Sequence, residues 1–498
     1  MNGIHWTNQY DRKSKLSRPV SARYDRPNIV LIMTDQHAAR VLGVAGDSAA
    51  QTPALDQLAA NGTVYSNAYC PSPLCVPSRM AFLTGLEPHR SGVLTNDDFL
   101  PPDVPTIAHS LGAAGYDCRL VGRMHFYGPD QLHGFASRPI GDIGPGWPGA
   151  GAPEIGPLTN ARGNHGSQVG GSGRGETSYQ AYDAAVADCG VETIEKLVRN
   201  RDATGRPFFA LVSLFCPHPP YIALPDDYDA VSDAVRPPEL EAPQKRHPAI
   251  AEWAEAGAVA LIDDDEVQRA RTAYYGLVRM VDRLAGQIVS AVAGRDDTVV
   301  IYTSDHGEAL GERGLWWKST FYEESAKVPL IIAGPGIARG HVDHRVTSLF
   351  DLSATILDLS DAPGLPGQVG RSLLTGGRWD DRAFSSYYGG LMNIKSKTLQ
   401  HRMLRRGAHK LCVYNGHLPQ LFDLANDPNE LSDIAGQRPK LVSQLLEELM
   451  AGWDPIAIAD MQARTVERTA LIRLWVKAAR PEEPYRWKDR KPERNRYL

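Results

Sequence analysis

The sequence has 498 residues, of which 42% are hydrophobic and 22% charged, as in a globular protein with one large domain and a smaller one. Its net charge of −5 and pI near 6.3 offer no general attraction to nucleic acids or anionic membranes. The first 26 residues lack a signal-peptide core, and no apolar run is long enough to span a bilayer. The six cysteines show no metal-site or disulfide spacing, so we expect a cytoplasmic protein.

Short apolar runs that end in polar residues predict the strands of the main domain. A continuous apolar run is typical of a strand buried on both faces of a parallel sheet. The runs comprise residues 28–33, 119–121, 208–215, 298–303 and 328–333. Helical periodicity at 187–198 and 277–288 places helices between them. We therefore expect an α/β fold with a mostly parallel sheet flanked by helices.

Polar residues of types common in active sites follow four of these predicted strands directly. In open α/β sheets, ligands bind beyond the carboxyl ends of the strands. This rule gathers the following residues, with Cys75, at one rim of the sheet: Asp35, Arg123, His125, His218, Asp305 and His306. The convergence predicts an active site at that rim. Residues 137–176 are rich in Gly and Pro, and we expect them to form a long surface loop, here called the excursion, beside the opening of this active site.

The character of the sequence changes near residue 376. Short strands at 402–405, 410–414 and 420–424 predict a small antiparallel sheet, and a helical pattern at 441–453 follows it. From Leu471 the chain carries large aromatic residues among prolines and basic residues, which predicts a tail that docks on another subunit or on its own chain. The expected units are an arm at 1–26, a catalytic domain at 27–375, a subdomain at 376–455 and a tail at 456–498, the last a candidate oligomerisation arm.

The segment Cys75-Val76-Pro77-Ser78-Arg79 is the most specific motif of the sequence. Pro77 is typical of a first helical turn and Gly85 of a helix end, so Cys75 is expected at a helix N-terminus, which favours an anion. Arg79 would project toward the same place. A thiolate phosphatase loop would require arginine six positions after the cysteine, where this sequence has Ala81.

The pattern Cys75-x-Pro77-Ser78-Arg79, followed by Leu83-Thr84-Gly85, resembles the signature of the formylglycine-dependent sulfatases of the alkaline phosphatase superfamily. The resemblance implies an alkaline phosphatase-like fold with a smaller C-terminal α+β subdomain. It also implies that a formylglycine-generating enzyme oxidises Cys75 to formylglycine, which serves as the nucleophile.

The resemblance also implies a metal site. Asp35, Gln36, Asp305 and His306 match its ligands, together with residue 75. Gln36 stands where a second aspartate is commoner, a pattern similar to the choline sulfatase and phosphonate monoester hydrolase branch. Oxygen ligands favour Ca²⁺ as the first choice, and the imidazole makes Mn²⁺ the second.

Further matches supply the groups that handle the anion. Gly122-Arg123-Met124-His125 resembles the family's Gly-Lys-x-His segment, with Arg123 in place of lysine, and His125 would help to release sulfate. His218 and Lys318 match residues that contact the bridging oxygen of the substrate, and Arg79 is a further donor. The candidate catalytic residues are therefore Cys75, Arg79, Arg123, His125, His218 and Lys318.

The resemblance implies hydrolysis of small-molecule sulfate monoesters, aryl or choline-like. We expect a homo-oligomer, a dimer or tetramer. We expect no nucleic-acid or membrane partner. A choline group would need an aromatic cage, for which Trp147, Trp316 and Tyr387 are candidates. One alternative is a phosphonate monoester or phosphodiester hydrolase on the same site. Another is an unmodified thiol protein that only binds anions. A phosphomutase should carry Ser or Thr as nucleophile and further metal ligands, a pattern that we do not find.

Overall fold

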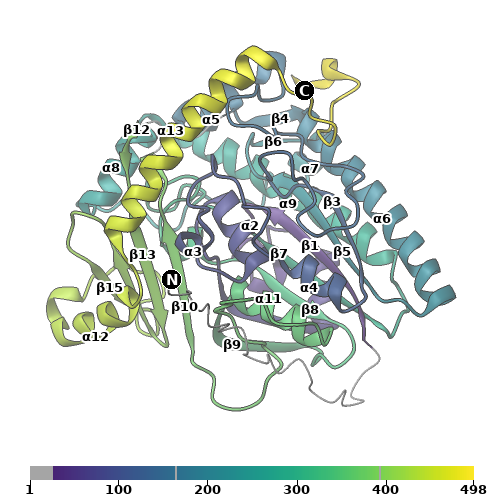
Figure 1. Cartoon of the computed structure of the whole chain (residues 1–498). Helices are drawn as coiled ribbons and strands as arrows, with labels where there is room; N and C mark the ends of the chain where they lie inside the picture. The colour runs from purple at the N-terminus through teal and green to yellow at the C-terminus, as the bar shows by residue number, and fades with distance from the viewer. Residues whose placement is uncertain (1–25, 163–164, 392–393) are drawn as a thin grey trace, which may run out of the picture.

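A computed structural model describes residues 26–162, 165–391 and 394–498, so the expected arm at 1–26 lies almost wholly outside the described residues. Its centre is a seven-stranded sheet (Figure 1). The strands in spatial order are β3 (Asp117–Gly122), β5 (Phe208–Pro217), β1 (Asn28–Asp35), β7 (Thr298–Ser304), β8 (Leu330–Ala333), β2 (Gly62–Tyr69) and β9 (His341–Ser348). Only the two pairings of β8 are antiparallel. The prediction of a mostly parallel sheet is confirmed.

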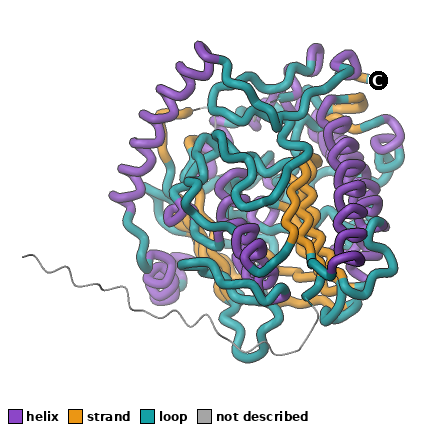
Figure 2. The backbone as a smooth tube through the Cα atoms, turned by 45° about the vertical axis from the view of Figure 1, so that its right-hand side comes forward, coloured by secondary structure: helices purple, strands orange, loops and turns teal. Residues whose placement is uncertain are grey.

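Helices cover both faces of this sheet, as Figure 2 shows from a second direction. One face carries α1 (Pro53–Ala60), α6 (Ser178–Thr204) and α9 (Asp264–Ser290). The other carries α2 (Cys75–Thr84), α4 (Ile107–Ala113) and α11 (Leu349–Leu359). The shorter helices are α3 (Pro88–Ser91), α5 (Gly166–Gly170), α7 (Pro225–Asp229), α8 (Pro248–Ala256) and α10 (Glu323–Ala326).

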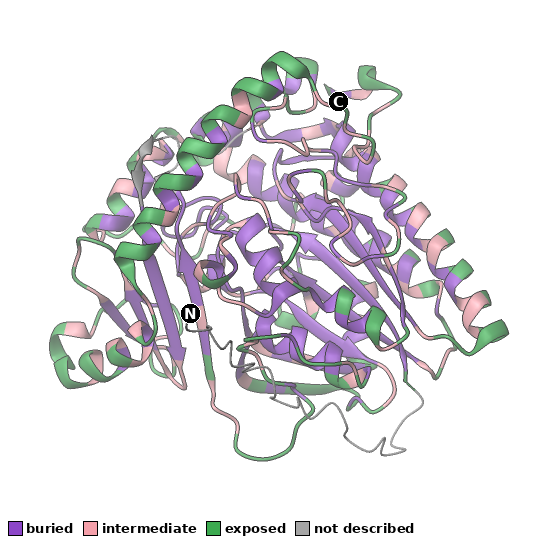
Figure 3. Cartoon of the chain, in the orientation of Figure 1, coloured by how far each residue is buried: buried purple, intermediate pink, exposed green. Residues whose placement is uncertain are grey.

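Strand β1 explains why the sheet needs both layers. Its side chains alternate, so that Val30 and Ile32 enter one hydrophobic core while Ile29 and Leu31 enter the other. All eight of its residues are buried (Figure 3). The middle of a strand buried on both faces is expected to be apolar, as residues 29–33 are, whereas the polar Asn28, Thr34 and Asp35 lie at the two ends of β1.

The C-terminal part forms the predicted antiparallel sheet. Its strands, in spatial order, are β10 (Arg382–Tyr387), β13 (His401–Arg406), β14 (His409–Val413) and β15 (Gln420–Asp423). Helix α12 (Pro439–Met450) packs Leu445 and Leu449 against Leu404, Leu411 and Leu421 of these strands. A hairpin of β11 (Gly390–Leu391) and β12 (Ile394–Thr398) stands apart from this sheet.

The tail begins as helix α13 (Pro455–Ala479), which continues beyond Leu471, where the sequence suggested irregular structure. The chain then returns over its own main domain. Strand β16 (Arg496–Tyr497) pairs with β4 (Gly173–Glu176), which pairs with β6 (Ile222–Ala223). In the part of the chain that the structure covers, no helix combines the length and the apolarity needed to cross a bilayer.

A buried ion cluster joins the C-terminal sheet to the main domain. Lys410 of β14 has no exposed surface, and its Nζ lies 2.8 Å from Oε1 of Glu323 and 2.6 Å from Oε1 of Glu430. The hydroxyl of Tyr69, at the end of β2, donates to Glu323 at 2.9 Å. Burial raises the pKa of Glu430 to about 7, because Lys410 offsets the desolvation only in part and Glu323 adds repulsion.

Replacing Lys410 by methionine should destabilise the protein by about 3–5 kcal/mol, because the fully buried Glu430 would lose its cation and Glu323 would keep only Lys327. In the variant, the pKa of both carboxyl groups in the folded state would be higher than about 4.3, the value in the unfolded chain. The folded state would therefore bind more protons than the unfolded state between these pKa values. The loss should therefore be larger at pH 8 than at pH 5. Urea unfolding at both pH values measures it, with Lys440→Met on the exposed surface of α12 as control. Equal losses at both pH values would contradict this account.

Candidate active site

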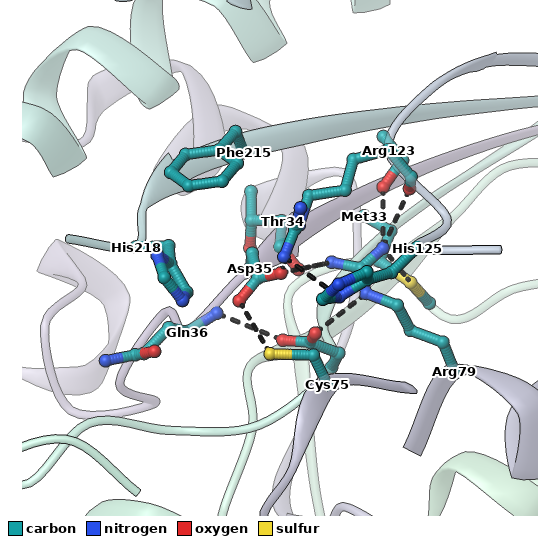
Figure 4. A network of polar contacts seen from close by, with 12 residues as sticks. Met33, Thr34, Asp35, Gln36, Cys75, Arg79, Arg123, His125, Phe215 and His218 are labelled. Atoms are coloured by element: carbon teal, nitrogen blue, oxygen red, sulfur yellow. Dashed lines mark hydrogen bonds and ion pairs between the residues drawn. The ribbon is translucent and has the colours of Figure 1, made fainter. Parts of the chain in front are cut away.

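The parallel pairing of β1 and β7 brings Asp35 and Asp305 together. Thr34 is the register partner of Ser304, so Asp35 and Asp305 leave the sheet side by side. Helix α2 begins at Cys75, whose thiol faces Asp35 (Figure 4). The Cys75 Sγ lies 3.5 Å from Oδ1 of Asp35 and 3.2 Å from Nε2 of His306.

These four side chains could hold a metal ion. Ligand atoms of Asp35, Cys75, Asp305 and His306 all lie within 4.8 Å of one another, and all four residues are buried. Two carboxylates and an imidazole suit a hard or borderline divalent cation. The donor set therefore fits the expected metal.

Arg79 lies between the two carboxylates. Its Nε donates to Oδ2 of Asp305 at 2.8 Å and its Nη2 to Oδ2 of Asp35 at 3.1 Å. Its Nη1 donates to the carbonyl of Arg123 at 2.8 Å and to Oγ of Ser213 at 3.0 Å. Protein acceptors thus occupy the whole guanidinium, which fixes the direction of both carboxylates.

Arg123 and His125 follow β3, as the sequence analysis expected. Nε of Arg123 lies 2.5 Å from Oδ2 of Asp35, and its Nη2 lies 3.1 Å from Nδ1 of His125. Its guanidinium also stacks over the Phe215 ring, 4.6 Å from the centroid. Burial and the neighbouring Arg123 lower the pKa of His125 to about 3, so its imidazole is neutral.

His218, Lys318 and Gln36 occupy the side opposite His125 (Figure 4 labels the two histidines and Gln36). Nδ1 of His218 bonds to the carbonyl of Pro219 at 2.7 Å, which directs its Nε2 away from that carbonyl. Burial and the positive charge of Lys318 hold the pKa of His218 well below its usual value. The Gln36 amide bonds to Lys318 Nζ and to Glu308 and points away from Cys75.

The structure therefore brings all ten predicted residues to one rim, but their side chains do not all face the same centre. Glu308 also belongs to the hydrogen-bond network of the site, although the sequence did not single it out. Besides Gln36 it accepts the Tyr221 hydroxyl at 2.7 Å and the N–H groups of Leu310 at 2.8 Å and Trp317 at 2.6 Å. Its place two residues after His306 was the only available signal.

The three residues proposed for an aromatic cage each contact different aromatic side chains. Trp316 is buried against Tyr221, and Tyr387 is buried against His401. Trp147, by contrast, is half-buried and contacts Phe99 and Trp475. Phe99 contacts Tyr127, and Tyr127 contacts His125, so an aromatic row runs from the site to Trp147.

The Cys75 thiol itself is poorly suited to ionise. Burial and the negative charge of Asp35 raise its pKa to about 12. A thiol must become a thiolate to act as nucleophile or metal ligand. The protein groups around Cys75 therefore favour the neutral thiol.

Comparison with known proteins relates the chain to enzymes that cleave sulfate esters. The sulfatase family model matches residues 27–362, and the model "N-sulphoglucosamine sulphohydrolase, C-terminal" matches residues 311–452. The choline-sulfatase of Rhizobium meliloti (strain 1021) is 32% identical over 478 residues, which cover 88% of this chain and 90% of that protein. The arylsulfatase K of Gallus gallus is 28% identical over 455 residues, covering 84% and 81% respectively.

Solved structures share the fold. The phosphonate monoester hydrolase of Agrobacterium radiobacter superposes with a TM-score of 0.66 at 23% identity, over 88% of this chain and 96% of that chain. A protein solved in complex with its substrate D-glucosamine-2-N,6-O-disulfate gives a TM-score of 0.66 at 21% identity, over 85% and 97%. These likenesses confirm the alkaline phosphatase-like fold with its separate C-terminal sheet.

Replacing Arg79 by alanine should lower the free energy of unfolding by about 3–5 kcal/mol, because the buried Asp305 would lose its arginine and Asp35 would keep only Arg123. Urea unfolding in the presence of a chelator measures the loss. The control is Arg90→Ala, an exposed residue of α3, for which we expect a change within about 0.5 kcal/mol. An Arg79 variant as stable as the control would show that the two carboxylates do not need it.

Proposed function

The chain belongs to the sulfatase family and hydrolyses sulfate esters, and from this premise we propose that it cleaves small-molecule sulfate monoesters with a formylglycine at position 75 and one divalent cation. The observation that carries the proposal is the setting of Cys75. Its side chain faces two buried carboxylates and an imidazole, where an oxygen nucleophile beside a cation would be stabilised.

The proposed cation would be held by Asp35, Asp305, His306 and residue 75, with Gln36 as a further ligand once its amide turns from Lys318. When present, the cation supplies positive charge beside the nucleophilic oxygen, and the hydrated formylglycine supplies that oxygen and the hydroxyl used to release sulfate. Ca²⁺ is the first choice because oxygen donors dominate, and Mn²⁺ is the second because His306 supplies nitrogen.

The remaining residues would bind the anion and move protons. Arg123 and Lys318 would neutralise the charge on the sulfate oxygens, while Arg79 keeps the carboxylates in place. Lys318, or His218 in its protonated form, would protonate the leaving alcohol oxygen. His125 would accept the proton whose removal releases sulfate, the role that the resemblance assigns to it.

The alcohol half of the substrate is proposed to be aryl or choline-like. Support comes from the relatives named choline-sulfatase and arylsulfatase K and from the aromatic row of His125, Tyr127, Phe99 and Trp147. A half-buried aromatic surface suits a flat ring or a quaternary ammonium group. Of the three cage candidates, Trp147 is therefore the one that we retain.

We further propose maturation by a formylglycine-generating enzyme, a cytoplasmic location and a homo-oligomer, a dimer or tetramer. Helix α13 supports the last point, because Ile456, Leu471 and Leu474 are 74%, 70% and 66% exposed. We retain the proposed units at 1–26, 27–375, 376–455 and 456–498, with α13 the part of the tail that could contact another subunit.

A phosphonate monoester or phosphodiester hydrolase is the second candidate, favoured by the fold shared with the Agrobacterium radiobacter enzyme. A pocket built from Arg123, Lys318 and a cation would accept other tetrahedral monoanions as well as sulfate. We propose such turnover as a secondary activity of the same site.

The deciding experiment combines mass spectrometry with a substrate panel. The peptide that contains Cys75 should show the mass of an aldehyde in place of the thiol, and kcat/KM should be higher for para-nitrophenyl sulfate than for the matched phosphonate ester. Cys75→Ala should lower kcat by at least about 10³-fold, as for a nucleophile, while Cys189→Ala on α6 should retain activity. A fully active enzyme with an unconverted thiol would refute the mechanism, and a preference for the phosphonate would reverse the two candidates.

Removal of the cation should abolish turnover, and Ca²⁺ or Mn²⁺ should restore it. Mutation of a residue that only hydrogen-bonds to a metal ligand typically weakens metal binding about 10–100-fold. Asp305→Asn should weaken cation binding by more than this, because it removes a charged ligand. Metal content and titration calorimetry measure this effect, with the exposed Asp226→Asn as control. Full activity after exhaustive chelation would exclude a required metal.

A further inference from the structure

Asp142 is a buried carboxylate in the Gly-rich excursion that contacts the segment carrying His125. Its Oδ2 accepts the backbone N–H of His125 at 3.0 Å and that of Met124 at 3.3 Å. The same oxygen is paired with Arg138, and Oδ1 lies 3.5 Å from Nη1 of Arg123. One carboxylate therefore fixes the backbone from which both His125 and its neighbour project.

The backbone at His125 needs such support. Its φ is +60°, in the left-handed region, which costs a residue other than glycine about 1–3 kcal/mol unless its surroundings impose it. The ring then lies with Nδ1 3.1 Å from Arg123 Nη2 and forms a T-shaped contact with Tyr127. A relaxed backbone at His125 would move the imidazole away from this position.

The C-terminal end of the chain holds Asp142 in turn. We call residues 483–487 the C-terminal clasp. The Trp487 N–H donates to the carbonyl of Asp142 at 2.9 Å, and the Gly141 N–H donates to the carbonyl of Tyr485 at 2.9 Å. Arg486 Nε donates to the carbonyl of Ile143 at 3.2 Å. Three consecutive residues of the excursion are thus bonded to the clasp.

Close approach to the clasp explains the glycine at position 141. A Cβ on Gly141 would lie 2.3 Å from the carbonyl oxygen of Tyr485, closer than any side chain tolerates. The φ of Gly141 is not in the left-handed region, so an alanine there would meet the clasp and not its own backbone. Gly151, ten residues later, has nothing within 4 Å of its Cβ position.

We infer that Asp142 is a positioning residue for His125 and that the C-terminal clasp keeps Asp142 in place. The inference rests on the proposed role of His125 in releasing sulfate. Loss of Asp142 or of the clasp should leave substrate binding and alcohol release largely intact, because Arg123 remains bonded to Asp35. Release of sulfate should become the slow step.

The first test is rapid-mixing kinetics of the full-length, mass-verified enzyme with para-nitrophenyl sulfate. Asp142→Asn should lower kcat about 10–100-fold with KM changed less than about threefold, as expected for a residue that orients a catalytic group. It should also show a burst of para-nitrophenolate approaching one equivalent per active site, since alcohol would leave faster than sulfate. His125→Ala serves as the reference and should show the same burst.

The second test separates positioning from a general loss of stability. Gly141→Ala should reproduce the burst and raise hydrogen exchange in residues 123–128 and 140–146, whereas Gly151→Ala should change neither. Asp142→Asn with wild-type kinetics, or Gly141→Ala without faster exchange at 123–128, would overturn the inference. Absence of a burst in His125→Ala would instead refute the proposed role of His125, so the two failures are distinguishable.

Discussion

The ion cluster of Arg79, Asp35 and Asp305 is the constraint on which the site depends. Two carboxylates are brought together by the parallel pairing of β1 and β7, and their mutual repulsion in a buried setting would be severe without a cation. Arg79 supplies that cation from the second turn of α2, so the residue that balances the charge also fixes the helix that presents Cys75. Charge balance and nucleophile position are thus set by the same helix.

Segments remote in sequence support this centre from outside. Lys410 ties the C-terminal sheet to Glu323, five residues after Lys318, and Glu308 fixes the amide of Gln36 to which Lys318 is bonded. On the opposite side the C-terminal clasp meets the loop that carries Asp142. The C-terminal parts of the chain therefore contact the segments that follow Lys318 and His125.

The sequence predicts the sheet and the rim well, because strands buried on both faces leave continuous apolar runs and polar residues at their ends meet by topology. That is why Asp35, His218 and Asp305 could be assigned to one place. It does not predict side-chain direction: Arg79 was expected to face the anion and instead binds two carboxylates. Asp142 lies in a stretch without periodicity, and its contact with His125 depends on a chain end more than 300 residues away.

The burial of residue 75 restricts when it can be modified. Only 1% of its surface is exposed, and Asp35, His306 and the first turn of α2 enclose its sulfur. On the proposed maturation, an enzyme that reads Pro77 and Arg79 would have to reach residues that the completed fold buries. On the proposed mechanism, oxidation must therefore precede the closure of β1 and β7 over the helix. The yield of active protein would then be decided by a competition between folding and maturation during synthesis.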